Sequence, residues 1–146
     1  MNLSQLSNIA IKAARSAGKV IQQYMNDDVK VEKKEGGVSY ASQVVTAVDI
    51  ECEKVILSHL LPTCDEFDVA LLSEETEDDG SRFKEDFFWC IDPMDGTLAF
   101  INKQPGFSVS IALVAKDGTP YIGVVFDPST DTLYHAIKGN GAFKNG

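Results

Sequence analysis

Apolar residues recur at helical spacing through the N-terminal segment. Between Leu6 and Tyr24 they are three or four positions apart, as on one face of an α-helix. The apolar positions are Leu6, Ile9, Ala10, Ala13, Ala17, Val20, Ile21 and Tyr24. Asn2 or Ser4 is suited to cap the start of this helix, and Asn26-Asp27-Asp28 is expected to close it. The pattern predicts a first helix with one buried face.

A second segment with helical periodicity runs from about Ala47 to Leu60. The apolar residues on its shared face are Val48, Cys52, Val55, Ile56 and Leu60. Thr46 followed three residues later by Asp49 resembles a capping box, with Asp in place of the usual Glu. Pro62 is expected to stop the helix, because proline lacks the backbone N–H that a helix interior needs.

The remainder of the chain has the pattern of strands. Val69–Leu72 and Phe87–Ile91 are short apolar runs, typical of buried strands. Further on, apolar and polar residues alternate with a period of two, which predicts an antiparallel meander over residues 107–113, 121–126 and 132–137. Residues 142–146 look like a short strand entering an Asn-Gly turn with no returning strand, as in a fold cut short. We therefore expect an α+β chain with two N-terminal helices packed on an antiparallel sheet.

Composition limits the kinds of partner. The chain has 146 residues, of which 44% are hydrophobic and 24% charged, typical of one globular domain. A formal net charge of −9 argues against a nucleic-acid polymer or an anionic membrane as partner, because both select basic surfaces. Three scattered cysteines suit neither a disulfide framework nor a zinc site, and no run is long and apolar enough to span a membrane. We expect free thiols and a reducing, cytoplasmic location.

The most informative stretch follows the strand at Phe87–Ile91. This strand delivers two carboxylates three residues apart, Asp92 and Asp95, to a Gly96-Thr97 turn before a short apolar segment. Carboxylates hold hard cations, and the N–H groups at a helix start hold anions such as phosphate. The same residue types also dominate ordinary turns and caps. Taken alone, the stretch is therefore as compatible with a turn as with a site.

Acidic residues stand at the ends of three predicted elements. They are Asp49 at the start of the second helix, Glu74 and Glu75 after one strand, and Asp92 and Asp95 after the next strand. If the two strands are neighbours, these carboxylates converge and repel one another unless cations such as Mg²⁺ lie between them. Bound cations could polarise a phosphate ester and lower the pKa of a bound water. Thr97 could orient that water or contact the phosphate.

These residues resemble the inositol monophosphatase superfamily. The similarity rests on Asp-Pro-Met-Asp-Gly-Thr at 92–97, on Glu74-Glu75 upstream and on Val45-Thr46-Ala47-Val48-Asp49. Further similar stretches are 107–113, 123–128 and 138–143, so the resemblance covers nearly the whole chain in order. Members are Mg²⁺-dependent, commonly lithium-sensitive phosphatases related to fructose-1,6-bisphosphatase. The resemblance implies that residues 1–146 are an N-terminal metal- and phosphate-binding domain, the first half of an α-β-α-β-α layered sandwich.

The resemblance also implies a role for each site residue. The positions that ligate metals in the family match Glu74, Asp92, Asp95 and the carbonyl of Met94. The positions that assist catalysis match Asp49, Glu75 and Thr97, of which Asp49 and Thr97 are linked to activating the attacking water. The backbone at Gly96 and Thr97 would contact the substrate phosphate. The segment from Lys33 to Gly37 would be a mobile, metal-responsive loop.

Two departures from the family pattern bear on function. Family chains are usually longer, and their second half carries a Trp-Asp-x-Ala-Gly-type motif that nothing here matches. That half supplies another metal-ligating Asp and most contacts to the rest of the substrate. We therefore expect a C-terminal domain to be absent from this chain, and residues 1–146 alone to lack activity. The second departure is Leu98-Ala99, where many members carry Thr-Asn or Lys-Glu, which weakens any subfamily assignment.

Several readings of the substrate and of the activity stay open at this point. The pattern from Phe107 to Pro128 is most similar to inositol monophosphatases, whereas Leu72–Glu75 is more similar to 3′(2′),5′-bisphosphate nucleotidases. Both readings imply a small phosphomonoester substrate and Mg²⁺, and we favour the first. A non-catalytic metal-binding or scaffolding domain is the alternative of a different class. Because family members are often homodimers, the resemblance also implies a homodimer for the full-length protein.

Overall fold

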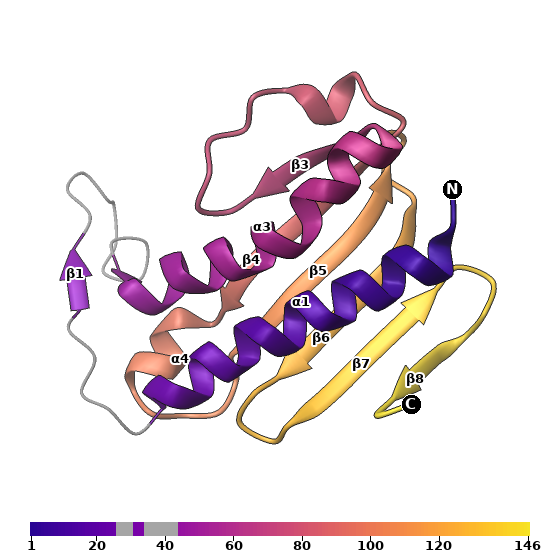
Figure 1. Ribbon diagram of the computed structural model, residues 1–146. Coiled ribbons are helices and arrows are strands. Elements are labelled where there is room, and N and C mark those ends of the chain that lie inside the picture. Colours follow the sequence, from indigo (N-terminus) through magenta and orange to yellow (C-terminus); the bar gives the residue numbers. More distant parts are fainter. Residues whose placement is uncertain (26–30, 34–43) are drawn as a thin grey trace.

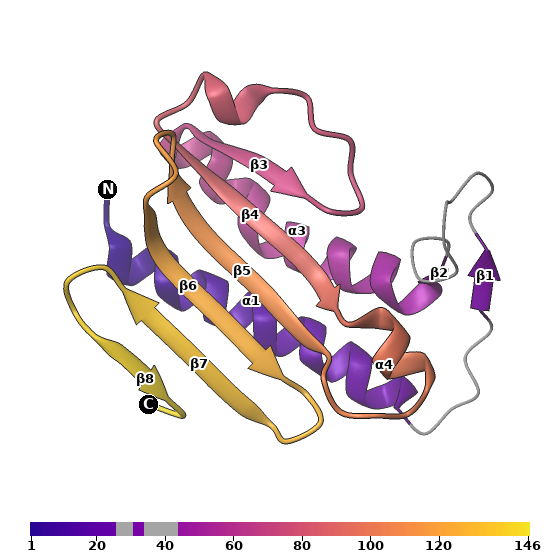
Figure 2. The ribbon, with the colours of Figure 1, turned by 180° about the vertical axis from the view of Figure 1, so that it is seen from behind.

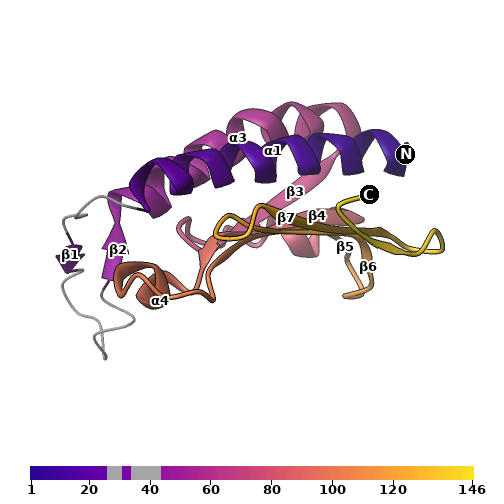
Figure 3. The same cartoon turned by 90° about the horizontal axis from the view of Figure 1, so that it is seen from below.

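Two long helices lie side by side on one face of a six-stranded sheet (Figure 1). The computed structural model describes residues 1–25, 31–33 and 44–146. Seen along the sheet, both long helices lie on the same side of it (Figure 3). The expected α+β class with two N-terminal helices is therefore confirmed.

Helix α1 (Leu3–Tyr24) follows the predicted pattern closely. The side chain of Asn2 caps it by accepting a hydrogen bond from the backbone N–H of Gln5 at 3.1 Å, which satisfies one of the unpaired donors at the helix start. The helix buries one face, and small residues on that face allow close packing. Its end at Tyr24 lies just before the predicted closing residues 26–28, which lie outside the described residues.

Helix α3 (Ala47–Phe67) runs past Pro62, so the expected stop at that proline is wrong. Pro62 is exposed, and water can satisfy the carbonyl that loses its partner there. The next residue, Thr63, is buried and accepts a hydrogen bond from Trp89 Nε1 at 2.8 Å. This contact with the core of the sheet holds the last turns of the helix in place. None of the described helices is long and apolar enough to cross a bilayer.

The large sheet has the strand order β3-β4-β5-β6-β7-β8 (Figure 2). The strands are β3 (Val69–Ser73), β4 (Phe87–Asp95), β5 (Ser108–Ala115), β6 (Pro120–Asp127), β7 (Thr132–Ile137) and β8 (Ala142–Lys144). β5 to β7 form the predicted antiparallel meander, and β4 and β8 extend it on either side, but β3 pairs with β4 in parallel. The sheet is therefore mixed rather than wholly antiparallel. A long connection containing the 3₁₀ turn η1 (Ser81–Phe83) returns the chain to the start of β4, as a parallel pair requires.

A second, two-stranded sheet precedes α3. Its strands are β1 (Val31–Lys33) and β2 (Val44–Thr46), which pair antiparallel, and β2 leads directly into α3. The predicted mobile segment from Lys33 to Gly37 lies outside the described residues except for Lys33, whose backbone ends β1. The side chain of Thr46, the first member of the predicted capping box, also lies outside them.

The core lies between the two helices and one face of the sheet. Alternate residues of β4, β5 and β6 are buried there, as the period of two predicts. They are Trp89, Ile91, Val109, Ile111, Leu113, Ile122, Val124 and Phe126. The intervening residues point to the opposite face, where Val125 and Tyr134 are 38% and 44% exposed. One face of the sheet is thus a packed core, and the other presents apolar side chains to the outside.

At Gly18, α1 packs directly against Phe126 of β6. A Cβ atom at this position would lie 2.1 Å from Cε1 of Phe126, a buried core ring. Gly18→Ala gains about 1 kcal/mol of helix propensity, but overpacking of this kind destabilises by about 1–3 kcal/mol. We expect a net loss of stability, measured as a lower urea midpoint. Gly123→Ala is the matched control, because a Cβ there meets nothing within 4 Å. A Gly18→Ala variant as stable as the parent would contradict this packing.

Candidate active site

The parallel pairing of β3 and β4 brings two predicted acidic residues together. Parallel strands end at the same edge of a sheet, and the N–H of Glu74 donates to the carbonyl of Ile91 at 3.1 Å, which extends the ladder one residue past β3. Glu74 therefore lies beside Asp92. Burial, a hydrogen bond with the Glu74 carboxyl and the charges of Glu74 and Asp95 raise the pKa of Asp92 to about 8.

A bulge in β4 places both aspartates on the same side of the sheet. Asp92 pairs with Ser110 and Asp95 pairs with Ser108, so two residues of β4 face one residue of β5. Residues three apart on a regular strand point to opposite faces, whereas Ser108 and Ser110, two apart, share a face. The extra residue at Pro93-Met94 therefore aligns the two carboxylates. Asp92 is half-buried and Asp95 is exposed.

Gly96 makes the turn that joins β4 to α4 (Thr97–Ile101). Its φ of 85° lies in the left-handed region that favours glycine. A Cβ atom here would also lie 2.2 Å from the carbonyl oxygen of Gly106. Only glycine fits this position, and the turn keeps Asp95 and Thr97 close to each other.

Gly96→Ala is expected to destabilise the chain by more than about 2 kcal/mol. The left-handed backbone alone costs an alanine about 1–2 kcal/mol, and the overlap with Gly106 adds to it. Gly80→Ala is the matched control, because Gly80 has a similar φ of 76° with nothing near its Cβ position. The measurement is the difference between the two urea midpoints. Equal midpoints for the two variants would show that the Gly106 carbonyl does not confine this turn.

Thr97 connects this turn to the start of α3. Its Oγ1 lies 2.9 Å from Oδ1 of Asp49 and 3.2 Å from the carbonyl oxygen of Met94, so its one proton can be donated to either acceptor. Asp49 is only 1% exposed and comes from a different element. The contact ties the first turn of α3 to the end of β4. Asp49, Met94, Gly96 and Thr97 thus form one continuous group.

The donor set suits a hard cation. Oδ1 of Asp92 is buried and has no hydrogen-bond partner among the described residues. It lines a shallow depression of about 400 Å³ that also includes Glu74 and Ser110. Within the described chain, no three His, Cys, Asp or Glu side chains are gathered closely enough to form a ready metal cluster. The charge of Asp95 acts unfavourably on Asp92, and a cation between the carboxylates would relieve that repulsion.

The predicted site residues lie at one end of the sheet, but not all of them contact one another. Glu74 and Asp92 meet directly, Asp95 acts on Asp92 through its charge, and Asp49 meets Thr97. Glu75 is half-buried in the turn after β3. Sequence reasoning missed Glu53 and Thr76, which join through a hydrogen bond beside this group. The available signal was the spacing of Glu53, four residues after Asp49 on the same helix face.

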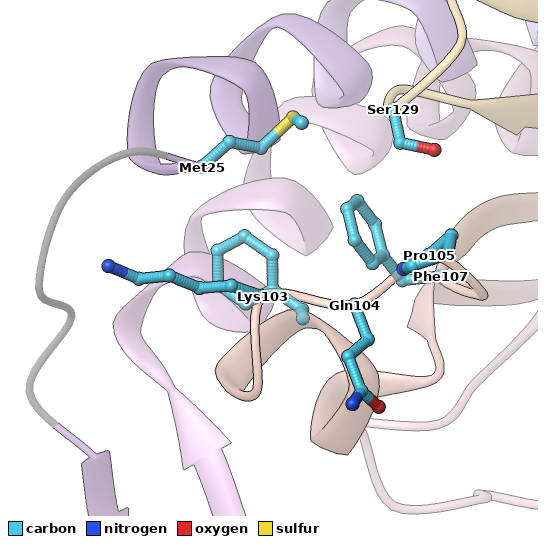
Figure 4. A pocket seen from close by; sticks show the side chains of 7 residues that line it. Met25, Lys103, Gln104, Pro105, Phe107 and Ser129 are labelled. Carbon is cyan, nitrogen blue, oxygen red and sulfur yellow. The ribbon is translucent and has the colours of Figure 1, made fainter.

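A second cavity, of about 290 Å³, lies at the end of α1 near α4 (Figure 4). The described residues that line it are mainly apolar, with Lys103 as the cation and no acidic residue among them. The lining residues are Met25, Phe100, Lys103, Gln104, Pro105, Phe107 and Ser129. None of the predicted metal, catalytic or phosphate-contacting residues lines this cavity. The carboxylate group at the end of β4 is therefore the better candidate for chemistry.

The sequence matches a known family over almost its whole length. The model of the inositol monophosphatase family matches residues 2–146. An inositol-1-monophosphatase of Bacillus subtilis is 35% identical over 144 residues, which cover 99% of this chain and 52% of that protein. Nus factor SuhB of Escherichia coli K12 is 37% identical over 139 residues, which cover 95% of this chain and 49% of that protein. The chain spans about half the length of the curated relatives that it matches.

Solved structures share the fold over the same half. An IMPase/NADP phosphatase complexed with NADP and Ca²⁺ matches with a TM-score of 0.81 and 27% identity, over 100% of this chain and 53% of that one. A dual specific IMPase/NADP phosphatase bound with D-inositol-1-phosphate matches with a TM-score of 0.78 and 26% identity, over 100% of this chain and 52% of that one. The expected fold family is thus confirmed for the matched half.

Proposed function

Because the chain belongs to the inositol monophosphatase family, we propose that it forms the metal- and phosphate-binding half of an Mg²⁺-dependent phosphatase that hydrolyses a small phosphomonoester. The observation that carries this proposal is the Glu74–Asp92 pair at the joint end of two parallel strands. In the absence of a cation, the two carboxyl groups share a proton. A divalent cation would separate the two groups and bind both of them.

The proposed roles follow the positions of the donors. Glu74, Asp92, Asp95 and the Met94 carbonyl would hold Mg²⁺, which when bound polarises the phosphate ester and acidifies a water molecule. Asp49, aligned by the Thr97 hydroxyl, would accept a proton from the attacking water, and Glu75 would assist. The backbone at Gly96 and Thr97 would contact the phosphate. The left-handed turn at Gly96 supports this role, because it places these backbone groups directly after the carboxylates at the end of β4.

The substrate class rests on the relatives. A structural neighbour is bound with D-inositol-1-phosphate, which supports a small phosphomonoester as substrate and favours an inositol monophosphatase-like activity. A 3′(2′),5′-bisphosphate nucleotidase is the runner-up, because Leu72–Glu75 is more similar to that group. A non-catalytic metal-binding or scaffolding domain is the alternative of a different class, and one relative carries a name that is not that of a phosphatase, Nus factor SuhB. We also propose that the phosphatase activity is sensitive to lithium and that the protein is cytoplasmic.

The outward face of the sheet supports a further layer of structure. Val125 and Tyr134 are cross-strand partners on this face and are 38% and 44% exposed, apolar surface of the kind that another layer of structure commonly covers. We propose that residues 1–146 act together with a C-terminal domain, and that the full protein forms a homodimer. On this view the site is incomplete in residues 1–146 alone, and we expect this half to bind cations without turnover.

Phosphate release tests the proposal. The 146-residue chain and the longer gene product that contains it should be assayed on inositol 1-phosphate and on 3′-phosphoadenosine 5′-phosphate, with and without Mg²⁺. We expect Mg²⁺-dependent release by the longer protein, faster with inositol 1-phosphate. The absence of release with every phosphomonoester would overturn the enzyme reading and favour the scaffolding one. Robust turnover by residues 1–146 would overturn the need for a second domain.

A further inference from the structure

Glu53 is a buried carboxylate to which the proposed mechanism gives no role. It lies on α3 one turn after Asp49, and only 8% of the residue is exposed. Burying a carboxylate is unfavourable unless hydrogen bonds compensate for the lost water. Its neighbour on the same helix face, Asp49, already holds Thr97. We therefore expect the Glu53 carboxylate to have a hydrogen-bond partner on the other side of the site.

That partner is Thr76. Its Oγ1 donates to Oε1 of Glu53 at 2.6 Å. Thr76 directly follows the predicted site residues Glu74 and Glu75, and its own N–H donates to the carbonyl of Ser73 at 3.3 Å. The Glu53–Thr76 contact thus closes the turn that carries both glutamates onto the side of α3.

α3 therefore reaches the site at two places one helical turn apart. Asp49 contacts the turn after β4 through Thr97, and Glu53 contacts the turn after β3 through Thr76. The two turns carry the carboxylates that must meet around one cation. Their backbones are joined to each other by the bond from Glu74 N–H to the Ile91 carbonyl. A rigid helix that binds both turns fixes the distance between them.

We propose that Glu53 is a positioning residue that holds the Glu74–Glu75 turn through Thr76 and so sets the affinity of the site for Mg²⁺. This inference rests on the proposed function for the identity of the cation. Residues that hold metal ligands in place typically contribute a factor of about 10–100 to metal affinity. We therefore expect Glu53→Leu and Thr76→Val each to raise the Kd for Mg²⁺ by about 10–100-fold, while Glu53→Gln and Thr76→Ser, which keep the hydrogen bond, stay close to wild type.

The chain offers a matched control at the other end of the same helix. Thr63 and Trp89 join α3 to the sheet by a buried side-chain hydrogen bond of 2.8 Å at the opposite end of the helix from Asp49 and Glu53, whereas the bond between Glu53 and Thr76 is partly buried. Thr63→Val should lower stability at least as much as Thr76→Val, because it leaves the buried Trp89 N–H without its partner, and should leave the Kd for Mg²⁺ unchanged. A loss of affinity in Thr63→Val equal to that in Thr76→Val would show that loosening of α3, not positioning by Glu53, explains the effect.

The experiment is titration calorimetry with Mg²⁺ alone on the full-length gene product, together with hydrogen exchange at the amide of Glu74. In Glu53→Leu we expect weaker Mg²⁺ binding and faster exchange at that amide, and no further loss when Thr76→Val is added. The proposal would be overturned if Glu53→Gln bound Mg²⁺ as weakly as Glu53→Leu does. It would also be overturned if the losses of Mg²⁺ affinity were additive in the double variant. If the wild-type protein does not bind Mg²⁺, the proposed function fails; exchange at Glu74 that is unchanged in Glu53→Leu overturns the positioning role separately.

Discussion

Asp95→Asn should abolish Mg²⁺-dependent phosphate release by the full-length gene product and leave its fold intact. The substitution replaces a proposed cation ligand by a neutral amide of the same shape. Loss of a residue that merely supports a ligand lowers metal affinity or activity by about 10–100-fold, so loss of a ligand itself should exceed about 100-fold. Asp95 is exposed and outside the core, so the free energy of unfolding should change by less than about 0.5 kcal/mol.

The charge of Asp95 gives this variant a second readout. Because the Asp95 carboxylate is one cause of the raised pKa of Asp92, the pKa of Asp92 should fall in Asp95→Asn. Carbon-detected NMR titration of Asp92 would measure this fall. Asp65→Asn is the control, an exposed aspartate near the far end of α3 whose loss should affect neither activity nor that pKa. Activity retained in Asp95→Asn would show that Asp95 is only a turn residue.

Hydrophobic periodicity was sufficient to predict most of the fold. The spacing of Leu6 to Tyr24 and the alternation of Val109, Ile111 and Leu113 reflect burial against the same core, and burial is what periodicity reports. Helix α3 shows the limit of this reasoning. Pro62 is a local signal to stop, but Thr63 contacts Trp89 from a distant strand, and that tertiary contact is invisible in local sequence.

The hydrophobic pattern could not predict the direction of strand β3 or the bulge in β4 either. A period of two is the same in a parallel and an antiparallel pair, so the parallel partnership of β3 with β4 could not be read from their residues. The spacing of Asp92 and Asp95 places them on opposite faces of a regular strand, and only the observed register reveals the bulge that aligns them. The acidic residues of the candidate site could be predicted because the chemistry of a site depends on residue type. The alignment of their carboxylates could not, because it depends on how the strands pair.

Asp92 leads to the second large expected effect, a coupling between Mg²⁺ and protons. Its pKa of about 8 in the cation-free chain means that the group is mostly protonated at neutral pH. A carboxylate must lose its proton to bind a cation, so Mg²⁺ binding below about pH 8 should release a proton. The apparent Mg²⁺ affinity should then fall by about tenfold for each pH unit below that pKa. Calorimetry in buffers of different ionisation enthalpy measures the proton released.

The same pKa fixes the sign of the pH dependence of stability. An unfolded aspartate loses its proton near pH 4, whereas folded Asp92 keeps it to about pH 8, so the folded state binds the extra proton between these values. The contribution of Asp92 to the stability of the cation-free chain should therefore decline as pH rises from about 4 to about 8. Asp92→Asn should remove this decline and make the cation-free chain more stable at pH 8, while Mg²⁺ binding and proton release are lost.

Asp117 provides the opposite case in the same chain. The Thr119 backbone N–H that it accepts at 2.9 Å lowers the pKa of this exposed carboxyl, so its contribution to stability is present at neutral pH and is lost only in acid. Asp117→Asn should leave Mg²⁺ binding and the slope between pH 4 and 8 unchanged. Mg²⁺ binding without proton release at pH 7, or an Asp92→Asn variant less stable than the parent at pH 8, would contradict a shared proton between Asp92 and Glu74. The strands would then bring these two carboxyls together without the repulsion on which the proposed cation site depends.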